Sequence, residues 1–212
     1  MNLKQLGIII TGLVILLFSS CSEYQKLLKS ENYELKYEKA IEYYENEDYY
    51  KAKGLFEELM NIYKGTDRAE KIHYYYAYCL YSEGELSLAA YHFDRFTKTY
   101  PKSKHKEDAI FRKALCFYEL SPKPSLDQDF TRRGINAFQT FLDNYPDTEY
   151  RDTVNKLVDE LHYKLEKKSY DNAYLYYKIG EYKAAIRALK NSVRKFPDSP
   201  FNEDARFYIL KS

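Results

Sequence analysis

Apolar side chains return every three or four residues from about Tyr33 onward, as in Ala89, Phe93 and Phe96. This period places the apolar side chains on one face of an α-helix and leaves the other face to charged residues. Gly84 and Pro101 fall between periodic segments, where a turn is expected and where proline cannot continue a helix. The pattern predicts an all-α protein, with helices near 68–83 and 86–100.

The periodic segments also repeat. Matching pairs are Ala77/Ala114, Cys79/Cys116 and Tyr81/Tyr118 at an offset of 37 residues, and Gly84/Gly180, Ala89/Ala185 and Pro101/Pro197 at an offset of 96. Glycine, then alanine five residues on, phenylalanine four later and proline eight further is the tetratricopeptide (TPR) pattern. We therefore expect a TPR-like solenoid of helix pairs, with four units and the start of a fifth: about 33–65, 68–102, 104–147, 148–198 and 200–212.

Small residues recur where the two helices of each unit are expected to cross, which lets their backbones approach. On the first helices they are Ala40, Ala77, Ala114 and Ala173, and on the second helices Ala52, Ala89, Gly134 and Ala185. Two departures from the simple period stand out. Eight extra residues at about 121–128 separate the helices of unit three, and Thr148 to Ile179 lacks Pro and Gly. The latter segment predicts an extended first helix of about 28–32 residues in unit four.

Residues 1–20 have the pattern of a lipoprotein signal peptide. Lys4 precedes an uncharged, mostly apolar run from Leu6 to Phe18, too short to span a bilayer comfortably. The run ends in Leu17-Phe18-Ser19-Ser20-Cys21, which resembles the bacterial lipobox. We expect an acyl and diacylglycerol lipid on Cys21 and a lipidated tether over 21–32. The alternative is ordinary secretion with cleavage near Ser20, which leaves a free thiol.

Charge and composition exclude several classes of function. Lys and Arg number 33 and Asp and Glu 32, so the chain lacks the basic excess of a nucleic-acid-binding protein. Cys79 and Cys116 occupy equivalent places in neighbouring units and read as small core residues. The four histidines share no metal-ligand spacing with them. No phosphate-binding loop or catalytic motif is present, so we expect no enzyme activity, no metal and no cofactor besides the lipid.

Aromatic residues form a stripe on the predicted first helices, seven residues or two turns apart. The pairs are Tyr37/Tyr44, Tyr74/Tyr81, Phe111/Tyr118 and Tyr170/Tyr177. In TPR arrays this face of the first helix lines the concave groove, and tyrosine offers a large contact area at low entropic cost. The first three pairs are therefore candidates for a substrate groove. The alternative is that the rings fill the seams between neighbouring first helices.

The lipobox, the tether, the TPR-like units with Tyr-Pro-x-Ser/Thr junctions and the long helix of unit four together resemble the BamD family. These are lipoproteins of the outer-membrane β-barrel assembly machinery. The segment Ser121-Pro122-x-Pro124-x-Leu126-Asp127-Gln128 is similar to the family's third unit, and Gly180-Glu181-Tyr182-x-Ala184-Ala185-Ile186 to its fourth. Many relatives have an arginine where this chain has Ala188, with Arg187 one place earlier. The resemblance makes Tyr182 and Arg187 candidates for docking a partner.

The resemblance implies a non-catalytic scaffold, lipid-anchored at the periplasmic face of the outer membrane. Units one to three (33–147) are expected to bind unfolded outer-membrane proteins. Unit four and the partial unit five (148–212) are expected to dock the BamA-like barrel-assembly subunit. The alternative is another membrane-anchored periplasmic TPR adaptor, serving cell division or polysaccharide export.

Overall fold

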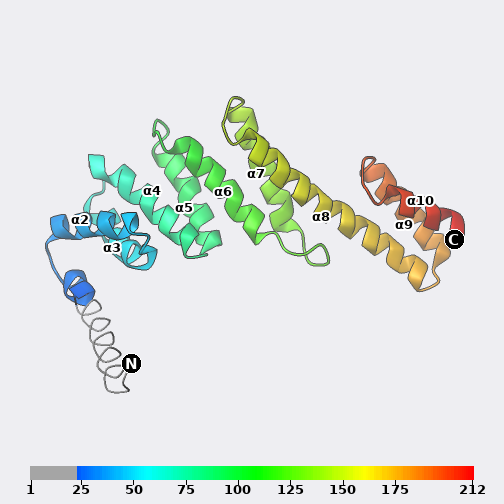
Figure 1. The fold of residues 1–212 in the computed structure, drawn as a ribbon, viewed down its shortest axis with the longest axis horizontal. Helices are drawn as coiled ribbons and strands as arrows, with labels where there is room; N and C mark the ends of the chain where they lie inside the picture. The colour runs from blue at the N-terminus through cyan, green and yellow to red at the C-terminus, as the bar shows by residue number, and fades with distance from the viewer. Residues whose placement is uncertain (1–22) are drawn as a thin grey trace, which may run out of the picture. The chain divides into compact units, whose positions relative to one another are not determined.

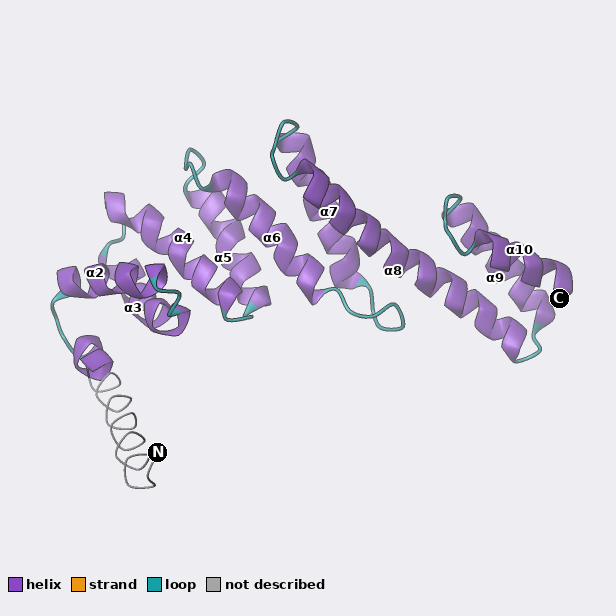
Figure 2. Cartoon of the chain, in the orientation of Figure 1, coloured by secondary structure: helices purple, strands orange, loops and turns teal. Residues whose placement is uncertain are grey.

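The computed structural model describes residues 23–212; the expected signal peptide and Cys21 lie outside the described residues. Residues 23–28 are helical and are followed by the helices that Figures 1 and 2 show. These are α2 (Tyr33–Glu45), α3 (Tyr49–Ile62), α4 (Asp67–Ser82), α5 (Leu86–Thr99), α6 (Lys106–Leu120), α7 (Asp129–Asn144), α8 (Arg151–Lys178), α9 (Tyr182–Lys195) and α10 (Asn202–Lys211). The described range contains no strand. The predicted all-α, TPR-like architecture is confirmed, with the helix ends of unit two within a residue of expectation.

The chain divides into two compact parts, one ending at Glu85 and the other running from Leu86 to Ser212. In the N-terminal part α3 packs against both α2 and α4. In the C-terminal part each helix from α5 to α10 packs against the next one in the chain, and α10 also contacts α8. Packing between consecutive helices is what a solenoid of helix pairs requires.

The small residues predicted at the helix crossings are buried. Ala40, Ala52, Ala77, Ala89, Ala114 and Ala185 have no exposed surface, and Gly134 and Ala173 are also buried. At Gly134 a Cβ atom would lie 2.9 Å from Leu161 Cδ1, so α7 and α8 pack as closely as a glycine permits. Larger residues at these positions would force the helices apart.

The turns between the two helices of units one, two and four share one cap geometry. Gly84 (φ 77°) and Gly180 (φ 82°) take the left-handed conformation that ends a helix, and the next residue's N–H returns to the last helical turn. In unit one Glu47 occupies this position with φ 61°. Its neighbour Asp48 makes the equivalent bond to the Tyr43 carbonyl at 2.8 Å. Unit one thus has the same turn without the glycine that the conformation favours.

The Pro-x-Ser/Thr junctions between units are held by a hydroxyl. Ser103, Thr148 and Ser199 each accept a hydrogen bond from the backbone N–H two residues further on, at 3.0–3.4 Å. The hydroxyl therefore stabilises the turn that leads into the next helix. At the junction between units one and two, the Thr66 hydroxyl instead donates back to the Tyr63 carbonyl at 2.7 Å.

Helix α8, drawn in yellow in Figure 1, spans 28 residues as the unbroken sequence predicts. Its first half supplies Val154 and Leu161 to a core cluster with α6 and α7. Its second half supplies Tyr170 and Ala173 to a separate cluster with α9 and α10. The extra length of α8 therefore connects two hydrophobic cores of the C-terminal part.

Candidate partner-binding surfaces

The aromatic stripe begins on α2 with Tyr37, whose ring is half-buried. Arg68 of α4 lies over this ring, 4.6 Å from its centroid, and pairs with Glu34 at 2.6 Å. The ring of Tyr63 at the end of α3 also contacts Tyr37, with centroids 5.7 Å apart. The Arg68 hydrogen bond holds the pKa of Glu34 below its usual range. Tyr37 thus lies in a surface cluster that joins α2 to α4.

Tyr44, two turns further along α2, packs more deeply. Its ring stacks flat on Tyr75 of α4, with centroids 3.9 Å apart and an interplanar angle of 5°. Tyr49, Phe56 and Tyr78 surround it edge-on. Burial among these rings raises the pKa of the Tyr44 hydroxyl above its usual value.

The second pair lies on α4. Tyr74 is 7% exposed, so it supports the surface from beneath rather than forming it. Tyr81 is half-buried, and its ring meets Tyr78 edge-on at 6.4 Å. Tyr37 and Tyr81 therefore keep more accessible ring surface than Tyr74.

The third pair, on α6, fills a seam between first helices. Phe111 stacks on Tyr150 beside the start of α8, with centroids 4.2 Å apart and an angle of 11°. Tyr118 hydrogen-bonds to Glu160 of α8, and this bond together with burial raises its pKa to about 12. The contacts of these two side chains favour the seam interpretation for unit three.

The fourth pair contacts α10. Tyr170 stacks on Phe201 at 5.4 Å and on Tyr174 at 5.7 Å, and Tyr177 packs on Tyr208 at 4.8 Å. Burial raises the pKa of Tyr170 to about 12. The first helix of the fifth unit thus covers the stripe of unit four.

The insertion in unit three is held by hydrogen bonds to the buried side chain of Gln128. Gln128 is 1% exposed, and its amide nitrogen donates to the carbonyls of Lys123 and Leu126 at 2.9 and 3.0 Å. Its amide oxygen accepts from the Thr131 hydroxyl at 2.7 Å. Because the Thr131 hydroxyl already donates its hydrogen to Gln128, the Ser121 hydroxyl is the donor in the 2.8 Å hydrogen bond to Thr131 Oγ1.

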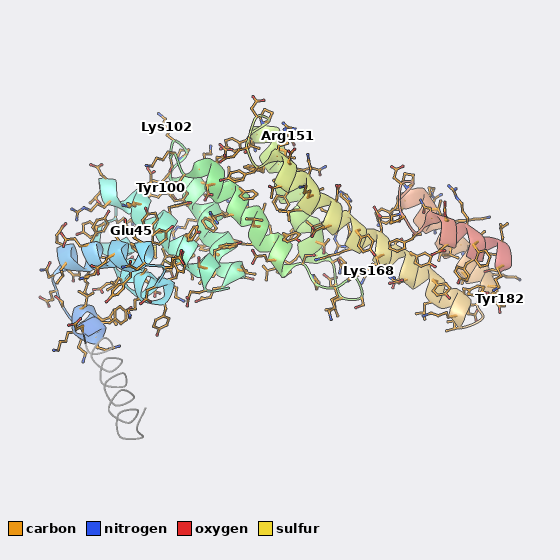
Figure 3. All side chains as sticks on the ribbon, in the orientation of Figure 1. Glu45, Tyr100, Lys102, Arg151, Lys168 and Tyr182 are labelled. Carbon is orange, nitrogen blue, oxygen red and sulfur yellow. The ribbon has the colours of Figure 1, made fainter. Side chains whose placement is uncertain are left out.

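Two lysines of α8 attach the same loop to the long helix. Lys164 donates to the Ser121 hydroxyl and carbonyl at 3.0 Å, and Lys168, labelled in Figure 3, donates to the Leu126 carbonyl at 2.6 Å. Desolvation lowers the pKa of Lys164. The loop presents Leu126, 57% exposed, at a fixed place on the surface.

The solvent face of α9 is basic. Lys183, Arg187, Lys190 and Arg194 are spaced four, three and four residues apart and are all exposed. At about 100° per residue they form one stripe, opposite the buried Ala185, Leu189 and Ser192. Residues 182–195 contain no Asp or Glu. We call these four residues the basic stripe.

Tyr182, the other predicted docking residue, stands at the start of α9 (Figure 3) and is 49% exposed. A groove of about 420 Å³ runs between α7, α8 and α9. Its lining includes the cations Arg132, Lys168 and Lys195 and the apolar side chains Leu165, Tyr176 and Phe196. A groove of this chemistry suits an extended acidic segment with an apolar side chain.

Cys79 and Cys116 are buried free thiols, and burial raises the pKa of each to about 12. Within residues 23–212, no cluster of His, Cys, Asp or Glu is placed to hold a metal ion. Nor does any described helix combine the length and apolarity needed to cross a bilayer.

The residues of the predicted stripe lie on the first helices α2, α4, α6 and α8, but the sequence analysis missed two stacking partners. Tyr75 and Tyr150 are the stacking partners of Tyr44 and Phe111. Tyr75 was missed because it follows Tyr74 directly and therefore does not fit the seven-residue spacing of the stripe. Tyr150 was missed because it lies just before α8 and not within that helix. The basic stripe was visible in the sequence as four cations at helical spacing without an intervening acid.

Comparison with known proteins yields one family. A family model described as YfiO, outer membrane lipoprotein, matches residues 30–212. A relative named outer membrane protein assembly factor BamD from Caulobacter vibrioides is 26% identical over 119 residues, or 56% of this chain and 39% of the relative. One of the same name from Xylella fastidiosa is 27% identical over 142 residues, or 61% and 47%.

A third relative, from Aquifex aeolicus, is named putative outer membrane protein assembly factor BamD. It is 27% identical over 201 residues, or 93% of this chain and 65% of the relative. The chain thus spans less than two thirds of the length of each relative. None of the three names is that of an enzyme.

Proposed function

The chain belongs to the YfiO family of outer membrane lipoproteins, and on that premise we propose that it is a non-catalytic scaffold in the assembly of outer-membrane β-barrel proteins. The family match over residues 30–212 is the observation that carries this proposal. The names of the relatives support it, since they are assembly factors. A signal peptide over 1–20 would direct export and be removed, and a lipid on Cys21 would then hold the scaffold at the periplasmic face of the membrane.

We assign capture of unfolded barrel proteins to units one to three. Such substrates are extended and expose aromatic side chains. Tyr37, Tyr44 and Tyr81 offer ring edges and hydroxyls to such a strand. Tyr74 of the same stripe is buried and would support this surface from beneath, whereas Phe111 and Tyr118 fill the seam between α6 and α8.

We assign docking of the BamA-like subunit to unit four and the start of unit five. Arg187 lies in the middle of the basic stripe, and Tyr182 lies beside its first member. A partner face with spaced carboxylates would match this stripe, because complementary charges guide association and fix orientation. The aromatic ring of Tyr182 would provide apolar contact area, as tyrosines do in many interfaces.

The test is affinity purification of the full-length, tagged chain from detergent-solubilised envelopes, followed by mass spectrometry. We expect the large barrel-assembly subunit to co-purify, with its recovery falling at least tenfold for Arg187→Glu. Lys102→Glu, a charge reversal at the exposed junction between α5 and α6, is the matched control and should leave recovery unchanged. Recovery of division or polysaccharide-export proteins instead of that subunit would contradict the proposed function.

A further inference from the structure

The segment that follows Cys21 is packed onto unit one. Tyr24 and Leu27 of this short helix are 7% and 9% exposed. The Tyr24 hydroxyl donates to the Lys51 carbonyl of α3 at 3.1 Å. The Tyr24 ring meets Tyr43 of α2 edge-on, with centroids 5.8 Å apart. These contacts involve both helices of unit one.

Gly54 of α3 provides the space for Tyr24. A Cβ atom at this position would lie 2.5 Å from the Tyr24 hydroxyl oxygen, closer than any ordinary contact. A glycine in the middle of a helix costs about 1 kcal/mol relative to alanine. The absence of a side chain here is what allows the ring of Tyr24 to seat against α3.

A buried cation holds the other end of the segment. Lys36 of α2 is 1% exposed, and its Nζ donates to the Leu28 carbonyl at 2.9 Å. The same ammonium group pairs with both carboxylate oxygens of Glu58 on α3, at 2.6 and 2.8 Å. The segment is therefore attached by aromatic packing near its start and by a charge-assisted hydrogen bond at its end.

The packed segment begins two positions after Cys21 in the sequence. Only Ser22 lies between Cys21 and Glu23, and a fully extended chain covers at most about 7 Å over these two residue steps. Resting on the proposed acylation of Cys21, we propose that unit one lies directly against the membrane and that its exposed face beside this segment contacts lipid headgroups. Residues 23–28 then act as a rigid mount, and no free linker lies between the lipid and unit one.

Exposed side chains beside the mount suit this contact. Lys26 and Lys29 are exposed on the segment itself, and lysines near a bilayer surface are attracted to anionic lipids. Tyr50 is 66% exposed and precedes Lys51, whose carbonyl accepts the Tyr24 hydrogen bond. Tyrosine, like tryptophan, is enriched at headgroup level in membrane proteins.

The experiment compares two insertions in the full-length, acylated chain. The same eight-residue Gly-Ser sequence is placed either between Ser22 and Glu23, ahead of the mount, or between Ser30 and Glu31, behind it. A fluorophore on Tyr50→Cys reports proximity to nitroxide-headgroup lipids in phosphatidylethanolamine–phosphatidylglycerol vesicles. Cys79 and Cys116 do not compete for the label, because both thiols are buried.

We expect strong quenching in the parent chain, at least a threefold loss for the insertion ahead of the mount, and unchanged quenching for the insertion behind it. A free tether predicts equal losses for the two insertions, and that result would overturn the inference. Gly54→Leu should displace Tyr24 and reduce quenching to a similar extent. Tyr24→Ala repeats this test without altering α3.

Flotation with the vesicles separates this inference from the proposed function. A chain that fails to float carries no lipid anchor, and that outcome removes both the proposal for Cys21 and the inference. Samples that float but lose quenching equally with both insertions overturn the inference alone. The anchored scaffold then stands.

Discussion

Tyr44 of α2 and Tyr75 of α4 lie face to face, with ring centroids 3.9 Å apart and planes within 5° of parallel. The two residues belong to the first helices of consecutive units. Their stack is the central contact of an aromatic group that also includes Tyr49, Phe56 and Tyr78. In the N-terminal part, packing between first helices thus depends on ring contact as well as on aliphatic burial.

A double-mutant cycle should detect this stack. Tyr44→Leu and Tyr75→Leu are each expected to lower the free energy of unfolding. Their coupling should be about 0.5–1.5 kcal/mol, the usual worth of an aromatic pair beyond the area that it buries. Urea titration of the four proteins gives the measurement. Additive effects would show that the two rings contribute independently.

Glu47→Gly should stabilise the protein by about 0.5–1 kcal/mol. Glu47 has φ 61°, a conformation that costs a residue with a Cβ atom about 1–2 kcal/mol. Glycine avoids this cost but loses about 0.5–1 kcal/mol more conformational entropy on folding, which leaves the smaller net gain. The change is read as a higher urea midpoint. The matched control is Gly84→Ala, which introduces the same strain at the equivalent turn of unit two and should destabilise by a similar amount.

Gln128→Ala should loosen the insertion of unit three. Its buried amide satisfies two loop carbonyls and the Thr131 hydroxyl, and leaving such groups unpaired costs about 1–3 kcal/mol. We expect faster cleavage by thermolysin beside the exposed Leu126. Gln139→Ala, at an exposed position of α7, is the control. Equal cleavage rates in the two variants would contradict the bridging role of Gln128.

Acid should weaken the contact between α5 and α6 through Asp94. Burial alone would raise the pKa of Asp94, but hydrogen bonds from Lys113 and Lys98 outweigh it and lower the pKa. A carboxylate with a lowered folded-state pKa stabilises the protein above its ordinary pKa of about 3.9, and this contribution disappears as the pH falls through the lowered value. Asp94→Asn should therefore destabilise by about 0.5–1 kcal/mol at pH 7.

The same difference should begin to shrink below about pH 3.9 and should continue to shrink as the pH falls through the lowered pKa of Asp94, where the wild-type carboxyl takes up its proton in the folded state. Unfolding free energies measured from pH 3 to pH 7 provide the check. The exposed Asp143→Asn serves as control and should show no such dependence. A gap between wild type and Asp94→Asn that stays constant across this range would exclude the ion pair as its cause.

Repetition made the fold predictable. Ala77 matches Ala114, and Gly84 matches Gly180. Because each of these repeat positions occurs in more than one unit, the sequence predicts where the helices cross and where the chain turns. The turn at Glu47 escaped this logic, since it uses the same backbone conformation without a glycine to signal it.

The contacts that escaped prediction are polar or lie outside the repeat. Lys36 and Gln128 are buried, yet hydropathy places such residues on the surface. Their burial depends on carbonyl groups that the tertiary structure brings to them. The stacking of Phe111 on Tyr150 likewise depends on the close approach of α6 to the start of α8. Periodicity can identify a face of a helix, but it does not identify what covers that face.

The two hydrophobic cores that α8 contacts limit which insertions or deletions this helix can accept. Leu161 faces the first cluster and Tyr170 the second. Deleting one residue between them would turn the second face by about 100° and withdraw Tyr170 from Phe201. Removing seven residues restores the angle to within about 20°. We therefore expect insertions or deletions between Leu161 and Tyr170 to occur in steps of seven residues. Each step would move the second core by about 10 Å along the axis of α8 relative to the first.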